Sequence, residues 1–539
     1  MPTRRNFLTT SAAVLGGLGM RTQPLAALSR RQRTCSPREW LPPEMGDDTM
    51  RSLARLAMEE ATRHGATYAD IRLGETQGLS LRQLMGTVLE PGLNIGAERQ
   101  YGIRVLVDGV WGFAGGGLLT REHIAAAARQ AVAHARHHAH AFASYKLDRV
   151  ELAPHTPQTG EWTTPVHIDP FTVPLVEHAE VIGAWSYAMS RSYGGSGNAS
   201  LQWSVQTRVF GSSEGALLVQ RLYRSFPTIQ YGFMGPTMPN FGLTSGGFET
   251  ITEPTVVDRA KAFIEDVVSL ERLPYSTTID VGKYPVVFDG RATAAHVDML
   301  TRALESDRVL GTEGDASGTS FLTPPEDILR ATAPLLSPLV TVAATPTATA
   351  FSSLKWDDEG VPLTAYPLIR DGRVVHYTTT RETALQIPDT NTPMLRGGLI
   401  ASDGELDNVP VVCVPEVTMT AAPQGPTFRD LVRDLREGVV VRMEYGVNPD
   451  TTLATAMSGG EYMYHVKGGA IIGKLPRNSY FLTRTSKLWN EQVVTVGGPS
   501  TVEYTGASGT KGIPWHSLSR LVTAPAVLLK DIHVAQLPS

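Results

Sequence analysis

The chain has 539 residues, of which 42% are hydrophobic and 19% charged, and its formal net charge is −5. This composition is typical of a globular protein with enough chain for two or more cores. Its charge balance does not favour a nucleic-acid-binding domain, which would show clustered lysine and arginine, so we expect no nucleic-acid partner. The two cysteines, Cys35 and Cys413, do not make a disulfide framework. We interpret Cys413, which lies in a strand-like apolar run, as a buried small hydrophobe.

The N-terminus has the pattern of a twin-arginine export signal. Arg4 and Arg5 precede an apolar run of small residues over 12–20. This run is too short to span a bilayer, and no other stretch has the apolar length of a transmembrane helix. We therefore predict export by the twin-arginine route to the periplasm, with a signal peptide at residues 1–29 and a linker at residues 30–47.

The first folded elements are predicted to be a helix and three strands. Apolar residues recur at helical spacing over residues 50–64, and an alternating strand follows over residues 66–73. An Asp-Gly turn joins residues 101–107 to residues 110–114, which predicts a β-hairpin.

A second helix is predicted over residues 121–136, with Thr120 as its cap. Four histidines lie near its end: His134, His137, His138 and His140. A solvated helix terminus explains them better than a metal site does. Strands over residues 200–211 and 216–226 and a helix over residues 256–270 follow.

A strand and a helix open the C-terminal half. Residues 285–288 form a short apolar run that predicts a buried strand, and apolar spacing from Thr293 onward predicts a helix. The side chains that could carry chemistry on or just beyond this helix are His296, Asp298, Glu305 and Asp307. A strand that leads into a helix with histidine and acids is where a zinc hydrolase would keep its metal.

The remaining C-terminal residues are predicted to be mostly strands. Residues 311–322 are polar and glycine-rich, which predicts a loop beside the helix. A hairpin is predicted over residues 366–377, because an Arg-Asp-Gly-Arg turn joins its two strands. Three adjacent acids precede it at Asp357, Asp358 and Glu359. Such acids are usually solvated surface, and a catalytic role for them stays open.

The chain resembles the TldD/PmbA family of metallopeptidases, also called modulators of DNA gyrase. The resemblance is carried by the segments GATYADIR and GIRVLVDGVWGFA near the N-terminus and by Ala303-Leu304-Glu305-Ser306-Asp307-Arg308. It implies a two-domain α+β protein. An N-terminal α/β domain would span residues 48–272, and a C-terminal domain of mainly antiparallel sheet would span residues 273–539.

The metal motif of the family is degenerate in this chain. Peptidase members carry His-Glu-x-x-x-His on the central helix, and the matching positions here hold Val297, Asp298 and Arg302. His296 lies one residue too early, which rotates its side chain by about 100° around the helix. The third family ligand, a cysteine near the C-terminus, aligns with Thr505. By this alignment, none of the three ligand positions offers a good zinc ligand.

The resemblance therefore leaves the chemistry of the site open. Asp298 aligns with the catalytic glutamate of the family, but it cannot act as a base if no metal is held. Arg302 opposes a metal electrostatically and could form an i,i+4 ion pair with Asp298. We expect no cofactor, and zinc only if the site functions unexpectedly, for example through His296 with His465 and His516. A weaker alternative is a different hydrolase that holds Mg²⁺, Ca²⁺ or Mn²⁺ through His296, Asp298, Glu305 and Asp307.

Two functions follow from the resemblance. The first is a metallopeptidase-like protein that acts on or binds peptides, with the cleft candidates His296, Glu305, Asp307, Asp358 and Glu359. Edge strands of the C-terminal sheets could capture an extended peptide. The second is a non-catalytic partner subunit of a motif-bearing family member. The family implies either a homodimer or a heterodimer with a second chain of the same family.

Overall fold

The computed structural model describes residues 35–536, apart from fifteen short internal stretches. These stretches are residues 85–86, 89–93, 146–147, 194–196, 232–236, 240–245, 276–278, 315–317, 348–351, 388–397, 401–405, 443–446, 460–461, 477 and 513–515. The predicted export signal at residues 1–29 lies outside the described residues.

An eight-stranded sheet dominates the N-terminal half. Its main path runs β4-β3-β1-β6-β7-β5, and β1 pairs antiparallel with both β3 and β6. The strands are β1 (Tyr68–Leu84), β2 (Thr87–Val88), β3 (Asn94–Val107), β4 (Val110–Gly116), β5 (Thr159–Thr163), β6 (Gly197–Ser212), β7 (Leu217–Tyr231) and β8 (Thr237–Pro239). Asp108 and Gly109 adopt positive φ angles of 51° and 73° between β3 and β4. The predicted Asp-Gly hairpin is thus confirmed.

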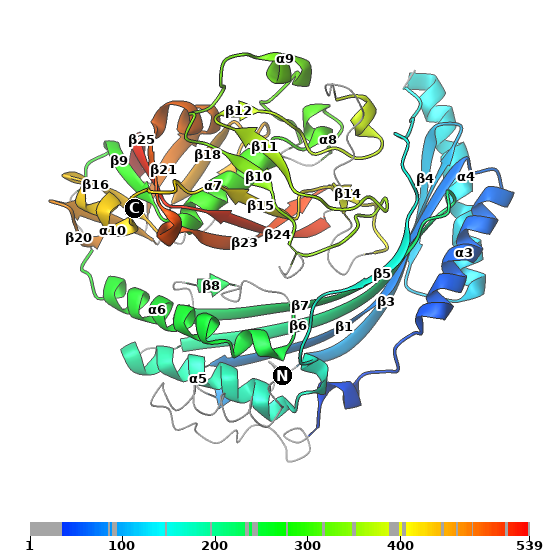
Figure 1. The fold of residues 1–539 in the computed structure, drawn as a ribbon, viewed down its shortest axis with the longest axis horizontal. Helices are drawn as coiled ribbons and strands as arrows, with labels where there is room; N and C mark the ends of the chain where they lie inside the picture. The colour runs from blue at the N-terminus through cyan, green and yellow to red at the C-terminus, as the bar shows by residue number, and fades with distance from the viewer. Residues whose placement is uncertain are drawn as a thin grey trace.

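Helices cover this sheet at both ends. The long helices are α3 (Asp47–Arg63), α4 (Arg121–Tyr145), α5 (Leu175–Tyr193) and α6 (Pro254–Glu271). Short 3₁₀ turns are η1 (Pro37–Trp40), η3 (Pro170–Thr172) and η4 (Phe248–Ile251). The helices α3 and α4 share a core with β1 and β3, whereas α5 and α6 pack near the opposite end. The long strands curve, and the C-terminal half of the chain lies over their concave side (Figure 1).

Two large sheets form the C-terminal half. The six-stranded sheet has the order β12-β11-β10-β15-β24-β23, and the nine-stranded sheet has the order β17-β18-β21-β25-β9-β16-β19-β20, with β22 beside β25. The strands of the first sheet are β10 (Val342–Ala344), β11 (Tyr366–Arg370), β12 (Arg373–Val374), β15 (Glu416–Met419), β23 (Glu503–Lys511) and β24 (His516–Ala524). Those of the second are β9 (Gly282–Phe288), β16 (Glu437–Val441), β17 (Val447–Pro449), β18 (Thr455–Gly459), β19 (Met463–Lys467), β20 (Ala470–Lys474), β21 (Ser479–Arg484), β22 (Val493–Val496) and β25 (Val527–Gln536).

The helix α7 (Gly290–Arg302) lies between these two sheets (Figure 1). Its Val297 and Leu300 are fully buried in one core with Val286 of β9 and Val522 of β24. The smaller elements around it are α8 (Ser306–Val309), α9 (Pro325–Arg330), η5 (Thr383–Leu385), β13 (Leu399–Ile400), β14 (Val411–Val412), α10 (Phe428–Arg433), α11 (Thr485–Lys487), η6 (Leu488–Gln492) and η7 (Pro499–Thr501). The helix predicted from apolar spacing is therefore the central helix of the C-terminal half.

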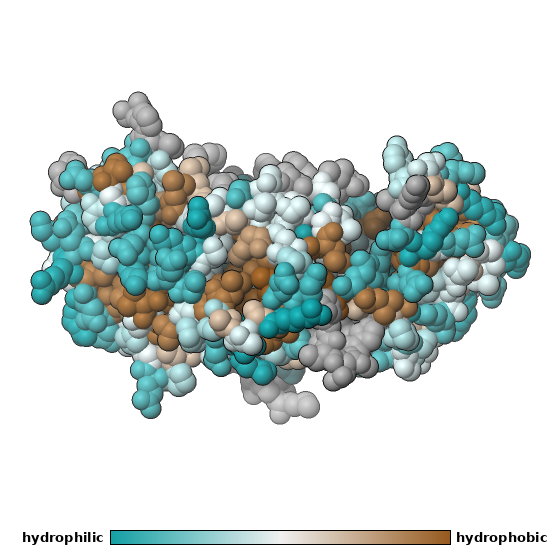
Figure 2. Space-filling view, turned by 90° about the horizontal axis from the view of Figure 1, so that it is seen from above, coloured by the Kyte–Doolittle hydropathy of each residue, from teal (hydrophilic) through white to brown (hydrophobic). Residues whose placement is uncertain are grey.

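The protein is α+β, with sheet-rich N-terminal and C-terminal regions. The C-terminal sheets are mainly antiparallel, with parallel pairs between β15 and β24 and between β16 and β9. Seen from above, hydrophobic areas lie among hydrophilic ones (Figure 2), which is ordinary for a globular surface. Within the described ranges, no helix combines the length and the apolar character needed to cross a membrane.

Candidate functional site

The start of α7 is fixed by Asp289. Its Oδ1 accepts a hydrogen bond from the backbone N–H of Ala292 at 2.8 Å and so caps the helix. Burial, together with the nearby negative charge of Glu503, raises the pKa of Asp289 to about 6. The preceding strand β9 anchors this end, because Val286, Val287 and Phe288 are buried.

His296 belongs to the core rather than to a cleft. Its ring is fully buried and stacks on Phe288, with 5.0 Å between ring centroids, and lies 5.8 Å from the ring of Phe481. Val297, at the first family ligand position, is also fully buried. The side chains of His296 and Val297 therefore both lie in the packed interior.

Asp298 lies between two guanidinium groups. Its Oδ2 is 2.8 Å from Nε of Arg302, and its Oδ1 is 2.8 Å from Nη1 of Arg520. The expected i,i+4 pair with Arg302 is confirmed. Arg520 comes from β24, is only 1% exposed, and donates hydrogen bonds to the carbonyl oxygen of Val414 at 2.9 Å and to Thr301 Oγ1 at 3.0 Å. This second cation is therefore held rigidly in place.

A second charge cluster follows directly after α7. Nζ of Lys511, at the end of β23, donates to Glu305 at 2.7 Å, to Asp307 at 2.9 Å and to the carbonyl oxygen of Val412 at 2.7 Å. Burial opposes ionisation of Glu305, but Lys511 and Arg308 lower its pKa to about 2. For Asp307, burial and the charge of Glu305 outweigh Lys511 and raise the pKa to about 6. The structure thus brings Glu305 and Asp307 together around one ammonium group.

Zinc does not fit the aligned ligand positions. Val297 offers no ligand atom, Arg302 is a permanent cation, and Thr505 is a partly buried residue of β23 that pairs with Val522. In the part of the chain that the structure describes, no three His, Cys, Asp or Glu side chains gather closely enough to hold a metal ion. Burial raises the pKa of Cys413 to about 12, so its thiol stays protonated.

The other histidines proposed for an unorthodox site lie elsewhere. His465 in β19 is 3.4 Å from Glu437, on the nine-stranded sheet. His516 lines a cavity of about 520 Å³ together with Asp307, Glu313 and Trp111. This cavity lies where the end of β3 and β4 meets the loop after α8. Among the cleft candidates, Asp307 lines it, whereas the remaining candidates do not.

The three acids after Trp356 are not solvated surface, so that interpretation was wrong. Asp357, Asp358 and Glu359 are at most 3% exposed, because this turn inserts against the N-terminal sheet. Asp358 forms an ion pair with Arg208 of β6, and Glu359 accepts a hydrogen bond from the backbone N–H of Arg381 at 2.7 Å. Burial and the neighbouring charge of Asp357 raise the pKa of Glu359 to about 8. Of the three acids, Asp358 joins the two halves of the protein, because its partner Arg208 belongs to the N-terminal sheet.

The histidine-rich end of α4 is partly packed. His134 and His138 approach the backbone carbonyl oxygens of Phe113 and Trp111 at 2.7 Å and 3.1 Å, respectively. Both contacts attach α4 to β4.

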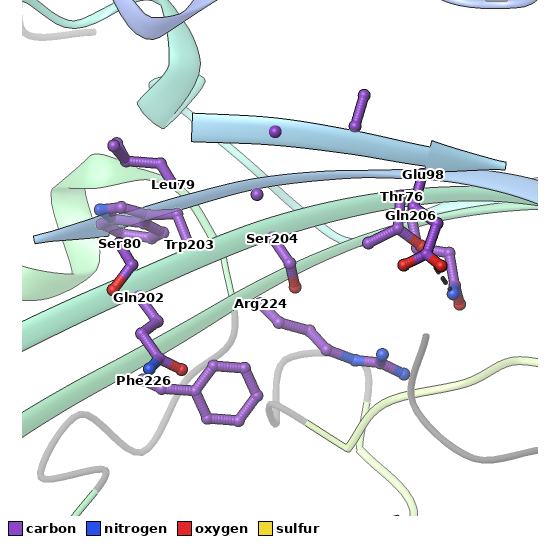
Figure 3. Close-up of a pocket in the computed structure, with 13 residues that line it drawn as sticks. Thr76, Leu79, Ser80, Glu98, Gln202, Trp203, Ser204, Gln206, Arg224 and Phe226 are labelled. Carbon is purple, nitrogen blue, oxygen red and sulfur yellow. Dashed lines mark hydrogen bonds between the residues drawn. The ribbon is translucent and has the colours of Figure 1, made fainter. Parts of the chain in front are cut away.

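A shallow polar groove lies on the concave face of the N-terminal sheet. Its volume is about 490 Å³, and Gly78 of β1 faces Gly96 of β3 on its floor. Figure 3 shows Gln202, Ser204 and Phe226 projecting from neighbouring strands, near Arg224. Phe226 packs against Tyr504 and Leu521 of the six-stranded sheet. The groove therefore adjoins β23.

Sequence reasoning missed Arg520, Lys511 and Arg208. Each is a buried cation whose acidic partner is far away along the chain, so local patterns do not reveal the pairing. The one available signal is a single arginine or lysine inside an otherwise apolar or small-residue strand, as at Arg520 before Leu521 and Val522.

Two family models match this chain. Residues 281–536 match the PmbA/TldA metallopeptidase C-terminal domain, and residues 69–135 match the PmbA/TldA metallopeptidase domain 1. The chain belongs to the TldD/PmbA family of metallopeptidases, as the sequence resemblance predicted.

Similar proteins agree with this assignment. A protein named Metalloprotease from Methanothermobacter thermautotrophicus is 24% identical over 414 residues, which cover 75% of this chain and 82% of the relative. A candidate modulator of DNA gyrase from Thermotoga maritima has a TM-score of 0.66 and 17% identity, over 90% of this chain and 99% of that one. TldE from Thermococcus kodakarensis has a TM-score of 0.64 and 14% identity, over 90% and 100% of the two chains. At these identities, the two solved structures show a shared fold.

Proposed function

We propose that this family member binds extended peptides and does not hydrolyse them with zinc. The observation that carries this proposal is the carboxylate of Asp298 held between Arg302 and Arg520, each at 2.8 Å. Asp298 aligns with the family's catalytic glutamate, and both of its carboxylate oxygens contact guanidinium groups. Guanidinium groups stay protonated at any physiological pH, so they repel a divalent cation.

The edge strand β23 supports the proposal that the protein binds extended peptides. In the described part of the chain, β23 is the last strand of its sheet and pairs only with β24. Its outer edge therefore offers backbone groups to an added strand. The polar groove around Gln202, Ser204 and Gln206 adjoins this strand through Phe226, and amide and hydroxyl groups suit a peptide backbone.

The same substitutions fit a second role, that of a non-catalytic subunit beside a motif-bearing family member. A homodimer is the other assembly that family membership suggests. Co-expression with an intact-motif family chain from the same source, followed by size-exclusion chromatography, separates these assemblies. Co-elution at one-to-one stoichiometry supports the subunit role, and elution of two separate species contradicts it.

The twin-arginine pattern at Arg4 and Arg5 supports export to the periplasm as part of this proposal. Replacing both arginines with lysine keeps the positive charge and removes the twin-arginine pair. We expect the double variant to stay in the cytoplasmic fraction while the unchanged chain reaches the periplasmic fraction. Equal export of both would contradict the proposed route.

Metal content tests the central proposal. Protein purified from its native compartment, and shown to be folded by circular dichroism, should contain far less than one zinc per chain by elemental mass spectrometry. A family member with an intact His-Glu-x-x-x-His motif, purified in the same way, is the control. Near-stoichiometric zinc in this chain would overturn the proposal.

Peptide binding needs its own measurement. Fluorescence anisotropy with a labelled extended peptide should show saturable binding. The same peptide, N-methylated at alternate residues, should bind weakly, because it cannot complete the strand-to-strand hydrogen bonds. Equal binding of both peptides would contradict strand addition.

A further inference from the structure

A cavity of about 600 Å³ lies where α6, the start of α7 and the first residues of β23 meet. Three arginines line it: Arg259 of α6, Arg291 of α7 and Arg442 after β16. Ala262, Phe263 and Val502 form an apolar wall beside them. The acids that face these arginines are Asp266, Asp289 and Glu503.

Arg442 is already neutralised. Its Nη1 is 2.5 Å from Asp266 Oδ2, and its Nε is 3.5 Å from Asp289 Oδ2. These two carboxylates raise the pKa of Arg442 despite its burial. Asp289 also caps α7, so neither the cap nor Arg442 is available to a ligand.

Arg259 and Arg291, unlike Arg442, are not neutralised by a carboxylate of any described residue at hydrogen-bond distance. Nε of Arg291 is 4.0 Å from Glu503, and its buried Nη1 forms no hydrogen bond with any described residue. The guanidinium of Arg259 lies 4.3 Å from the ring centre of Tyr504 and forms no ion pair among the described side chains. Burial lowers the pKa of Arg259 and the charge of Arg291 adds to this effect, whereas Tyr504 and Glu503 oppose it. Arg259 and Arg291 therefore share one cavity in which Asp266 is bound by Arg442, and the carboxylate beside them is that of Glu503.

An anion with two acceptor oxygens could bind Arg259 and Arg291, because a guanidinium group binds a carboxylate through two parallel hydrogen bonds. The position of the cavity indicates which carboxylate. Glu503 and Tyr504, which begin β23, line it together with the preceding residue Val502. A peptide strand that runs antiparallel to β23 therefore ends here with its C-terminus.

We propose that this cavity holds the C-terminal carboxylate of a peptide paired antiparallel with β23. The proposal rests on the peptide-binding function proposed above and adds a direction and an end group to it. Arg259 and Arg291 would bind the carboxylate, and the apolar wall of Phe263 and Val502 would take the side chain of the last residue. The protein would thus select peptides with a free C-terminus.

The test compares one labelled peptide as its free acid and as its C-terminal amide. Fluorescence anisotropy should show that the unaltered protein binds the free acid about tenfold more tightly or better, which is the size expected for a charge-assisted pair. In the double variant Arg259→Gln/Arg291→Gln, the free acid should bind no more tightly than the amide does. The affinity for the amide should stay as in the unaltered protein.

Arg63→Gln provides the matched control, because Arg63 is an exposed arginine of α3 on the opposite side of the N-terminal half. It should keep the preference for the free acid. Equal affinity of the unaltered protein for acid and amide would overturn the carboxylate site and leave peptide binding intact. Failure of both peptides to bind would overturn the peptide-binding function as well. The comparison in the unaltered protein needs no variant, so misfolding of the double variant does not prevent a decision.

Discussion

Single residues decide the chemistry of this family member. The sequence alone predicted that Val297, Arg302 and Thr505 replace the family's ligands and that Arg302 pairs with Asp298. It could not predict Arg520, because the contact between Asp298 and Arg520 joins α7 to a strand more than two hundred residues later. Nor could it place His296 in the core, because apolar spacing does not show which neighbour a helix faces.

The ion pairs of Asp298 lead to a stability prediction. Asp298→Asn removes the counterion of Arg520, which is only 1% exposed, so the free energy of unfolding should fall by about 3 kcal/mol. Urea denaturation followed by circular dichroism measures this loss. The matched control is Asp258→Asn, whose side chain is 74% exposed beside Lys261, and which should cost less than about 0.5 kcal/mol. An equally small loss for both variants would show that Asp298 is not a structural counterion.

Whole elements were easier to predict than their lengths. The hairpin around Asp108-Gly109 and the helix before Gly65 follow from local turn and cap chemistry, and both occur. The strand predicted over residues 66–73 continues to Leu84, past Gly74 and Gly78. Glycine normally weakens a strand, but β1 is held by partners on both sides, so tertiary pairing overrides local preference.

The buried turn at residues 357–360 predicts a pH dependence. Glu359 has an ordinary pKa of 4.5, but burial raises its pKa to about 8 in the folded protein. Between these values the unfolded chain loses the proton while the folded protein keeps it. Stability should therefore fall as the pH rises from about 5 to 8, by up to about 1.4 kcal/mol per pH unit, and should not fall further on this account above pH 8.

Glu359→Gln should remove this dependence, because glutamine can still accept the hydrogen bond from the N–H of Arg381 without ionising. The variant should match the unaltered protein near pH 4 and exceed it in stability at pH 8, measured as urea midpoints across this range. Glu253→Gln, at an exposed position before α6, should leave the pH profile unchanged. Parallel profiles for Glu359→Gln and the unaltered protein would contradict the assignment.

At the scale of the whole molecule, charged groups join the two halves. The ion pair between Arg208 and Asp358 is buried, and Arg381 binds Glu214 through two contacts of 2.7 Å and 2.9 Å. The fold class could be predicted from the sequence, because it depends on element types and on family motifs. The docking of the halves could not, since each contact pairs residues that are far apart in the chain and individually look like surface charges.

Arg208→Ala should weaken this docking. Removing one member of a buried ion pair costs about 3 kcal/mol, and here the cost falls on the contact between the halves. Differential scanning calorimetry should show a lower unfolding temperature for this variant than for the unaltered protein. Arg221→Ala, which removes a partly exposed pair with Glu44, is the control and should leave the transition nearly unchanged. An identical thermogram for Arg208→Ala would mean that other contacts hold the halves together.

The position of β25 has a consequence for biosynthesis. This strand lies inside the nine-stranded sheet, between β21 and β9, yet the ribosome makes it after every other strand in the described part of the chain. Until it emerges, β9 and β21 each keep an open edge, and open edges invite aggregation. The nascent C-terminal half therefore depends on protection by chaperones until β25 has been synthesised. A chain that stops before Val527 should be recovered as an insoluble product rather than as a shortened folded protein.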